Sequence, residues 1–117
     1  MPTASDCLFC KIGAKEMDAD IVHTSEHVVA FRDINPQAPT HILMIPKDHI
    51  DSAAALEDGH AKLLAELFQT AAHLAQAEGI DRGGWRLVTN VGPDAGQSVR
   101  HLHFHLLGGR PMRWPPG

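Results

Sequence analysis

Short runs of apolar and β-branched residues, separated by turn-forming residues, predict that much of this chain folds into β-strands. The first two runs are joined by Ser25-Glu26-His27 and are typical of a hairpin, and Pro46 halts the third run. In the last run, polar and apolar residues alternate, and a period of two predicts a strand that buries one face. The first four runs lie at residues 21–24, 28–32, 41–45 and 85–90, and the last is the alternating segment within residues 97–107.

One segment instead has the period of a helix. Apolar residues recur there at intervals of three and four, which places them on one stripe of the helix surface. Asp58 is the candidate N-cap, Gly79 stands where a C-terminal cap is expected, and residues 7–12 predict a shorter helical turn. Five strands and one long helix predict an α+β fold, with the helix packed on one face of an antiparallel sheet. The residues of the stripe are Leu64, Leu67, Phe68, Ala71, Leu74 and Ala75.

The last run carries the most informative pattern, because His101, His103 and His105 occupy its alternate positions. In a strand these imidazoles share one face, about 6–7 Å apart, whereas a helix would turn the middle ring away from the other two. Histidine near neutral pH can be a nucleophile, an acid, a base or a metal ligand. The middle ring, His103, is the best placed to be a nucleophile with a supporting group on each side. The simpler alternative is a polar strand that faces solvent.

The segment H-L-H-F-H-L-L resembles the signature of the histidine triad (HIT) superfamily, in which histidines alternate with apolar residues. Residues 31–47 and 108–117 are similar to the Hint branch of this superfamily, and the resemblance covers nearly the whole chain from Cys7. It implies one HIT domain at residues 7–117 that ends in a tail at residues 110–117. It also implies that two such five-stranded sheets join into a ten-stranded sheet in a homodimer.

The resemblance implies hydrolysis of purine nucleoside 5′-phosphoramidates, such as adenosine 5′-phosphoramidate or aminoacyl-AMP, to a nucleoside monophosphate and an amine. His103 is implied to form a nucleotidyl-histidine intermediate. His105 and His41 are implied to hold positive charge near the phosphoryl oxygens, and His101 completes the row unless it binds a metal. Ser98 is implied to lie near the leaving group. The alternatives are a nucleotide-binding regulatory module with little catalysis, a dinucleoside polyphosphate hydrolase and a structural protein that uses its histidines for zinc alone.

A glycine-rich loop at residues 92–98 precedes the histidines. Glycines let backbone N–H groups approach an anion, although most such loops are simply turns. The resemblance implies that Asn90, Gln97 and Ser98 contact the phosphate together with the second and third histidines of the row. We therefore expect this loop to form part of a phosphate site.

Five residues outside the loop complete the expected nucleotide site. Asp33 is implied to accept hydrogen bonds from the ribose hydroxyls, and the residues alone are equally consistent with a turn-forming aspartate. Phe9, Ile12 and Ile34 are implied to wall the base pocket, although apolar side chains are more often part of a core. Trp114, in the tail, is implied to reach the active site of the partner subunit and to help select the amine.

Cys7 and Cys10 form a C-x-x-C pair, which in a reducing compartment is more typical of a metal site or free thiols than of a disulfide. A tetrahedral zinc site needs two further ligands, and His49 and His101 are the candidates. Such a zinc would be structural, would fix the N-terminal segment against the sheet and would remove His101 from acid–base chemistry. The alternative is a pair of buried thiols.

Composition narrows the class of protein further. A chain of 117 residues is expected to form a single domain, and a formal net charge of −4 argues against a nucleic-acid-binding surface. No apolar run approaches the roughly 20 residues that span a bilayer, and no signal peptide is recognisable, so we expect a cytoplasmic protein without membrane partners. Residues 1–6 are small and polar and are expected to be disordered.

Overall fold

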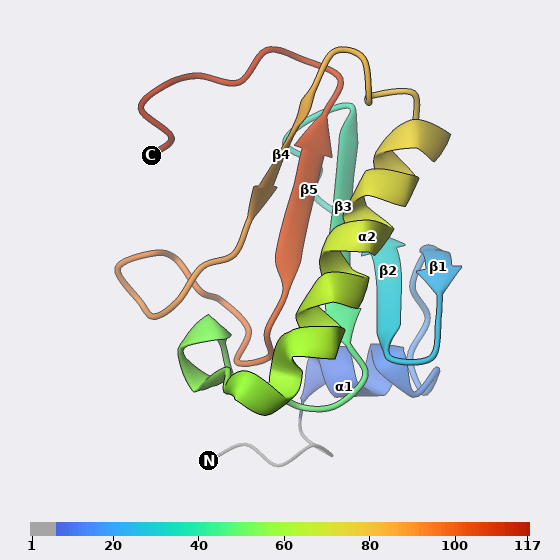
Figure 1. Cartoon of the computed structure of the whole chain (residues 1–117), viewed down its shortest axis with the longest axis vertical. Coiled ribbons are helices and arrows are strands. Elements are labelled where there is room, and N and C mark those ends of the chain that lie inside the picture. Colours follow the sequence, from blue (N-terminus) through green and yellow to red (C-terminus); the bar gives the residue numbers. More distant parts are fainter. Residues whose placement is uncertain (1–6) are drawn as a thin grey trace.

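The computed structural model describes residues 7–117, and its centre is one five-stranded antiparallel sheet (Figure 1). The strands lie in the order β1-β2-β3-β5-β4, so β5 is inserted between β3 and the edge strand β4. The predicted α+β fold with one long helix is confirmed. The elements are α1 (Leu8–Gly13), β1 (Ile21–Thr24), β2 (Val28–Arg32), β3 (Thr40–Pro46), 3₁₀ turns at Ala53–Ala55 and Asp58–His60, α2 (Ala61–Ala77), β4 (Trp85–Val88) and β5 (Phe104–Gly108).

Each face of the sheet is covered by one helix. Helix α2 crosses one face (Figure 1) and packs on Ile42, Met44 and Leu106, which are fully buried. Helix α1 packs on the opposite face and buries Phe9 and Ile12. Strand β3 lies between the two layers and is buried along its whole length. For this reason its sequence is a continuous apolar run instead of an alternating one.

The long helix begins later than the sequence indicates. Helix α2 starts at Ala61, because the 3₁₀ turn Asp58–His60 precedes it, and Asp58 is therefore not its N-cap. The turn is closed by a capping box in which Glu57 and His60 each accept a hydrogen bond from the backbone of the other. The polar groups that signal a helix start in the sequence thus stabilise the turn before the helix.

Two further predictions concern the stripe and the end of α2. Phe68 was expected on the buried stripe, but it is 53 % exposed, since it lies at the margin where its ring meets the edge of Phe104. Gly79 follows the helix with φ of +74°, a conformation that favours glycine, so the predicted C-terminal cap is confirmed.

The strand predicted to carry all three histidines is only partly correct. Of the three histidines, His105 alone lies in β5, and His101 and His103 precede it. The partner strand β4 ends at Val88, short of the predicted residue 90. Beyond that point the two segments are joined by a side-chain hydrogen bond, in which the Thr89 hydroxyl donates to the His103 carbonyl oxygen at 2.8 Å.

The alternation along this segment nevertheless holds. Leu102, Phe104 and Leu106 pack into the core beneath α2. The rings of His101 and His103 face the opposite layer, where they contact Phe9 of α1. The period-two pattern therefore predicted the two faces correctly, although regular pairing covers only the second half of the segment.

No helix within residues 7–117 is both long enough and apolar enough to cross a membrane. The predicted disorder of residues 1–6 lies outside the described residues.

Candidate active site

His103 is held with one ring nitrogen free. Its Nδ1 lies 2.6 Å from the backbone oxygen of His101, and since a carbonyl oxygen only accepts, Nδ1 carries the proton and donates. The other nitrogen, Nε2, therefore keeps an unshared electron pair. The Phe9 ring packs edge-on against the imidazole with 5.0 Å between ring centres, and only 4 % of His103 is exposed. His103 is thus an oriented ring whose Nε2 can act as a nucleophile.

A second hydrogen-bonded chain fixes the protons of His41 and His105. The Gln37 backbone N–H donates to His41 Nδ1 at 3.0 Å, so Nδ1 is the unprotonated nitrogen of that ring. His41 Nε2–H then donates to His105 Nδ1, 2.9 Å away, and the proton of His105 is on its Nε2. The His103 and His105 rings are 5.2 Å apart. The chain therefore ends in a hydrogen-bond donor beside His103.

Asp33 closes a turn in its own loop, as one of the two interpretations of its sequence position predicted, and it also lies near His41. One carboxylate oxygen accepts from the Asn35 backbone N–H at 2.8 Å, which closes a turn of the Asx type. The other oxygen lies 3.5 Å from His41 Nε2. The carboxylate thus faces the histidine pair while it shapes its own loop.

Burial keeps the histidine pair uncharged at neutral pH. Burial, with the neighbouring charges of His103 and His41, lowers the pKa of His105 from 6.5 to about 4. Burial also lowers the pKa of His41, and the nearby Asp33 carboxylate opposes that shift. His105 can therefore donate a hydrogen bond from Nε2 without first taking up a proton.

The lowered pKa of His105 predicts a pH dependence of stability. The unfolded residue binds a proton below about pH 6.5, whereas the folded ring resists protonation until about pH 4. The free energy of unfolding therefore falls as the pH falls through this window. We expect Tm to decline less steeply between pH 7 and pH 4 in His105→Asn than in the wild type. Each 1 kcal/mol of difference in the free energy of unfolding corresponds to about 4 °C in Tm. The exposed His73→Asn should keep the wild-type slope, and equal slopes in all three proteins would contradict the assignment.

Gln97 ties the glycine-rich loop to the body of the protein. Its Oε1 accepts from the Gly92 N–H at 2.9 Å, and its Nε2 donates to the carbonyl oxygens of Asp51 and Val99. The oxygen and both N–H groups of this side chain already have protein partners. Gly92 and Gly96 have φ of +82° and +86°, in the left-handed region that glycine tolerates. The structure thus assigns Gln97 a part in shaping the loop.

A cavity of about 640 Å³ lies on the α1 side of the sheet, and we refer to it as the apolar cavity. Its floor includes Phe31 and Leu43, and Asp18 and Asp20 lie at its border. Phe9 and Ile12 are buried in the core beneath α1 and also line this cavity, and their contact with a nucleotide base stays a prediction. Five residues singled out from the sequence meet here: Phe9, Ile12, Asp33, Ile34 and Ser98.

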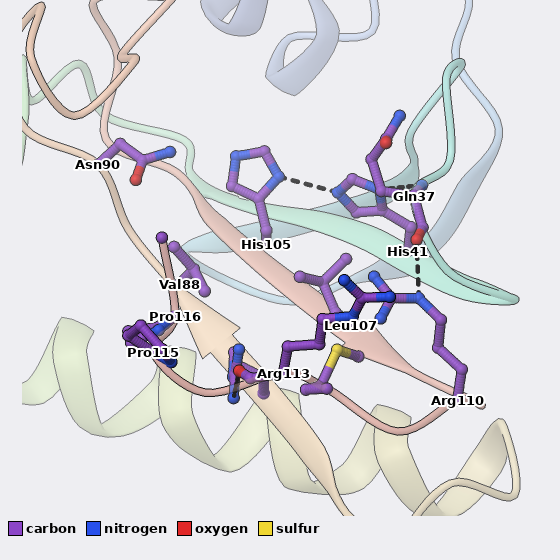
Figure 2. A pocket seen from close by; sticks show the side chains of 13 residues that line it. Gln37, His41, Val88, Asn90, His105, Leu107, Arg110, Arg113, Pro115 and Pro116 are labelled. Atoms are coloured by element: carbon purple, nitrogen blue, oxygen red, sulfur yellow. Dashed lines mark hydrogen bonds between the residues drawn. The ribbon is translucent and has the colours of Figure 1, made fainter.

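A second cavity, of about 730 Å³, opens at the His41–His105 pair (Figure 2). We refer to it as the arginine cavity, because Arg86, Arg110 and Arg113 line it. Asn90, which was predicted to contact phosphate, also lies on its wall. The C-terminal tail of the same chain forms one side, and Pro115 and Pro116 border the opening there (Figure 2).

Trp114 lines neither of these cavities. It is 81 % exposed, and its ring centre lies 6.0 Å from the guanidinium carbon of Arg86, within the range of a cation–π contact. The contact of Trp114 with a nucleotide in a partner subunit stays a prediction.

Two cysteines and two histidines meet at the start of α1. Cys7 Sγ and Cys10 Sγ lie 3.3 and 3.4 Å from His101 Nδ1, and Cys10 Sγ is 3.3 Å from His49 Nδ1. The four donor atoms lie within 4.8 Å of one another. Zinc bonds of about 2.3 Å to sulfur and about 2.0 Å to nitrogen place tetrahedral ligand atoms about 3.5 Å apart. The spacing of the predicted ligands therefore fits a zinc ion.

The far nitrogens of these two histidines support the same conclusion. His49 Nε2 lies 2.8 Å from a carboxylate oxygen of Asp51, and His101 Nε2 lies 2.8 Å from the Pro46 carbonyl oxygen. Both partners accept, so both Nε2 atoms carry protons and both Nδ1 lone pairs face the sulfur atoms, as metal ligands require. Burial and the adjacent Cys7 raise the pKa of the Cys10 thiol to about 11, and a cation would favour its ionised form.

A second group of possible ligands does not have this orientation. Atoms of Asp33, His41 and His105 also lie within 4.8 Å of one another. However, Gln37 donates to His41 Nδ1, so the nitrogen that faces the other two residues carries a proton. This group is therefore arranged as a hydrogen-bonded chain and not as a metal site.

Two contributors to the site were missed in the sequence. Asp51 orients His49, and the spacing H-x-D could have indicated a carboxylate partner for a metal-binding histidine. The Gln37 backbone N–H sets the protonation pattern of His41, and a backbone group leaves no signal in the sequence.

The structure thus sets the buried His103 beside the hydrogen-bonded pair of His41 and His105 on a five-stranded sheet, an arrangement consistent with the resemblance to the histidine triad superfamily. Comparison with known families agrees, because the model of the HIT domain matches residues 14–112. The chain therefore belongs to the HIT family, and its similarity to a protein named HINT1 places it on the Hint-like branch.

The similar proteins cover almost the whole chain. It is 50 % identical over 115 residues to the "14 kDa zinc-binding protein" of Zea mays, an alignment that spans 97 % of this chain and 89 % of that protein. It is 46 % identical over 118 residues to "Adenylylsulfatase HINT1" of Arabidopsis thaliana, which spans 99 % of this chain and 80 % of that one. Among solved structures, the HIT family hydrolase from Legionella pneumophila Philadelphia 1 is 53 % identical, with a TM-score of 0.93 over 95 % of this chain and 99 % of that chain.

Proposed function

We propose that this protein is a hydrolase of nucleoside 5′-phosphoramidates that works through a covalent intermediate on His103. The observation that carries the proposal is the hydrogen bond from His103 Nδ1 to the His101 carbonyl, which leaves Nε2 with its electron pair. A solvent-facing histidine would not need this orientation next to a neutral donor such as His105. His103 also lies outside the groups of side chains within residues 7–117 that could hold a metal ion. The similarity to proteins named as HIT family hydrolases supports hydrolysis as the class of reaction.

The proposed reaction has two displacements at phosphorus. His103 Nε2 attacks the α-phosphorus, the P–N bond breaks, and the amine leaves with the electron pair and takes up a proton. Water then attacks phosphorus, the bond to Nε2 breaks, and the nucleoside monophosphate and the free imidazole are restored. The Nε2–H of His105 would stabilise the negative charge that builds on the phosphoryl oxygens. The Ser98 hydroxyl is the proposed proton donor to the departing amine.

The nucleotide is proposed to enter with its base in the apolar cavity. Phe9, Ile12 and Ile34 would contact the flat purine, and the Asp33 carboxylate would accept hydrogen bonds from the ribose hydroxyls. Asn90 lines the arginine cavity and Ser98 lines the apolar cavity, and both would contact the phosphate. Gln97 would keep the loop in place. His41 and His105 line the arginine cavity, and Asp33 of the apolar cavity lies 3.5 Å from His41 Nε2.

We also propose that Cys7, Cys10, His49 and His101 bind a structural zinc. Ligand spacing and the protonation of both far nitrogens support it, and two of the similar plant proteins are named as zinc-binding. The ion would favour the ionised form of the Cys10 thiol, which burial disfavours. His101 would then serve the reaction only through its backbone carbonyl.

A second reaction deserves a direct comparison, because one similar protein is named an adenylylsulfatase. Adenosine 5′-phosphosulfate carries sulfate where the phosphoramidate carries an amine, and the same attack by His103 would release it. Dinucleoside polyphosphates and simple nucleotide binding without turnover are the remaining alternatives.

We further propose a homodimer that forms at the edge strand β4. This edge is open in the sheet order, Trp85 on it is 37 % exposed, and Trp114 in the adjacent tail is largely exposed. Exposed strand edges with large apolar side chains are typical of pairing surfaces. Light scattering of the purified protein should give twice the chain mass, and the mass of one chain would refute the dimer.

The intermediate itself can be detected. Wild-type protein mixed with adenosine 5′-phosphoramidate and quenched with base within milliseconds should gain the mass of one AMP on the peptide that holds His103, and AMP should accumulate later. Base is chosen because phosphohistidine bonds are more stable in base than in acid. AMP release with no adduct at any quench time would point to direct attack by water, and neither adduct nor AMP would refute this substrate class.

A further inference from the structure

Helix α1 joins the cysteine pair to the active site. Cys7 precedes the helix, Cys10 lies in its first turn, and Phe9 stands between them in sequence. Between ring centres, Phe9 is 5.0 Å from His103 and 6.1 Å from His101, and it also lines the apolar cavity. In Figure 1, α1 lies at the end of the sheet where β5 begins. A change at the cysteines therefore reaches a ring that packs on the proposed nucleophile.

His101 makes a second connection between the cysteines and the active site. Its Nδ1 lies 3.3 Å from Cys7 Sγ and 3.4 Å from Cys10 Sγ. Its backbone oxygen accepts the hydrogen bond from His103 Nδ1, 2.6 Å away. The residue whose ring faces the two sulfur atoms thus orients the His103 ring through its carbonyl group.

The two cysteines are placed for oxidation to a disulfide. A C-x-x-C pair at the start of a helix is the arrangement found in thiol–disulfide oxidoreductases. Both thiols are free, the Cys10 backbone N–H donates to Cys7 Sγ at 3.4 Å, and the two sulfur atoms lie within 4.8 Å of each other. Cys7 is 6 % exposed, whereas Cys10 is only partly buried. An oxidant in solution therefore meets Cys10 first, with Cys7 next to it.

We propose that hydrogen peroxide oxidises Cys7 and Cys10 to a disulfide, and that this modification releases the metal and lowers the hydrolytic activity. The inference rests on the proposed zinc and the proposed hydrolysis, and it adds a modification site to them. The Cys10 thiolate attacks a peroxide oxygen, the O–O bond breaks, and a sulfenic acid and hydroxide form. The Cys7 thiolate then attacks the sulfenic sulfur, the S–S bond forms, and a second hydroxide leaves. The sulfur atoms lose two electrons, the peroxide gains them, and both hydroxides take up protons to become water.

The disulfide removes the charges that hold the metal. Two thiolates become neutral sulfur atoms, and the two histidines that remain, His49 and His101, are too few ligands for a structural zinc site, which has four. The S–S bond also draws the first turn of α1 toward the residue before it. Phe9 moves with the helix, and the backbone of His101 moves once its ring is released, so the proposed nucleophile loses the contacts that orient it.

Zinc-loaded wild type treated with hydrogen peroxide, with catalase added to stop the oxidation, supplies the test. A non-reducing peptide map should show the Cys7–Cys10 disulfide, and a chromogenic zinc indicator should detect the released ion. The kcat for adenosine 5′-phosphoramidate should fall about 10- to 100-fold, because a displacement of about 1 Å at a reacting group costs about that much. Treatment with a thiol reductant and then with zinc should restore it.

Two variants separate the disulfide from other oxidation. Cys10→Ser cannot form the disulfide, so its kcat should be the same before and after peroxide. Met17 is 45 % exposed and lines the apolar cavity, so its oxidation to the sulfoxide is the competing route. Met17→Leu should therefore lose zinc and kcat to the same relative extent as the wild type. A parallel loss of kcat in Cys10→Ser would overturn the proposal.

Three further outcomes would overturn it: a wild type that holds no zinc, a disulfide that leaves kcat unchanged, and oxidation of Met17 while both thiols and the zinc are retained. Failure of the hydrolysis is distinguishable from these. If the wild type forms the disulfide and releases zinc but hydrolyses no phosphoramidate even before treatment, the proposed function fails. Calorimetry with AMP then still tests the link to the site. A Kd at least about tenfold weaker after oxidation supports the link through Phe9, and an equal Kd overturns it.

Discussion

Replacing His103 with alanine should abolish turnover of adenosine 5′-phosphoramidate and leave nucleotide binding largely intact. The imidazole of His103 is the group proposed to attack phosphorus, so kcat should fall at least about 10³-fold without it. Binding should survive, because His103 is only 4 % exposed and offers little contact surface compared with the apolar cavity. Steady-state release of AMP measures the first effect, and calorimetry with AMP measures the second.

His73→Ala is the control for this experiment, since His73 is exposed on α2 and far in sequence from the row. It should keep the wild-type kcat. A His103→Ala protein that retains more than about a tenth of kcat would show that another group or water attacks phosphorus. If the wild type also releases no AMP while AMP binds, a nucleotide-binding module becomes the better description of the protein.

The parts of the fold that the sequence predicted are those governed by local periodicity. Alternation in the histidine segment correctly placed Leu102 and Leu106 in the core and His103 on the opposite side, because side-chain direction follows from an extended backbone alone. The apolar stripe of α2 was equally clear. The predicted start of α2 was wrong, because the polar residues that begin a helix can also begin a 3₁₀ turn.

The limits of the strands depend on partners distant in sequence. β5 pairs with β3 from Phe104 onward: Met44 pairs with Phe104, and Leu43 with His105. The same register places His41 opposite Leu107, one diagonal step from His105. His41 and His105 are 64 positions apart, and this pairing brings His41 Nε2 to 2.9 Å from His105 Nδ1. A local sequence pattern cannot predict such a contact.

The arginine cavity likewise could not be predicted from local sequence. Arg86 lies on β4, and Arg113 lies in the tail that returns along that edge, so neither residue stands out in the sequence as part of a site. The two arginines meet only in the folded protein, where they line one cavity, and no aspartate or glutamate of residues 7–117 lines it with them. Candidate ligands for a metal were easier to find, because the two cysteines of the chain stand together as a C-x-x-C pair, which is typical of a metal site.

Loss of the metal cluster is expected to be the largest single perturbation of stability. The ligands come from the start of α1, the loop after β3 and the segment before β5, so a bound ion joins three separate parts of the chain. At free zinc about 1,000 times above Kd, binding to the folded state contributes about 4 kcal/mol. Cys10→Ser should therefore lose zinc and lower Tm by about 15 °C, which elemental analysis and thermal denaturation can measure together.

Chelation supplies the decisive comparison, because it removes zinc without changing a side chain. Wild type treated with a strong chelator should fall to the Tm of Cys10→Ser, and the variant should not respond to the chelator. Lys11→Ala, on α1 but outside the ligand set, should behave as wild type in both tests. The effect should extend to catalysis, because the carbonyl that orients His103 belongs to His101, whose ring is a proposed ligand. A Cys10→Ser protein that keeps full kcat at a temperature where it is folded would show that the cluster serves stability alone, and an unchanged Tm after chelation would refute the structural zinc.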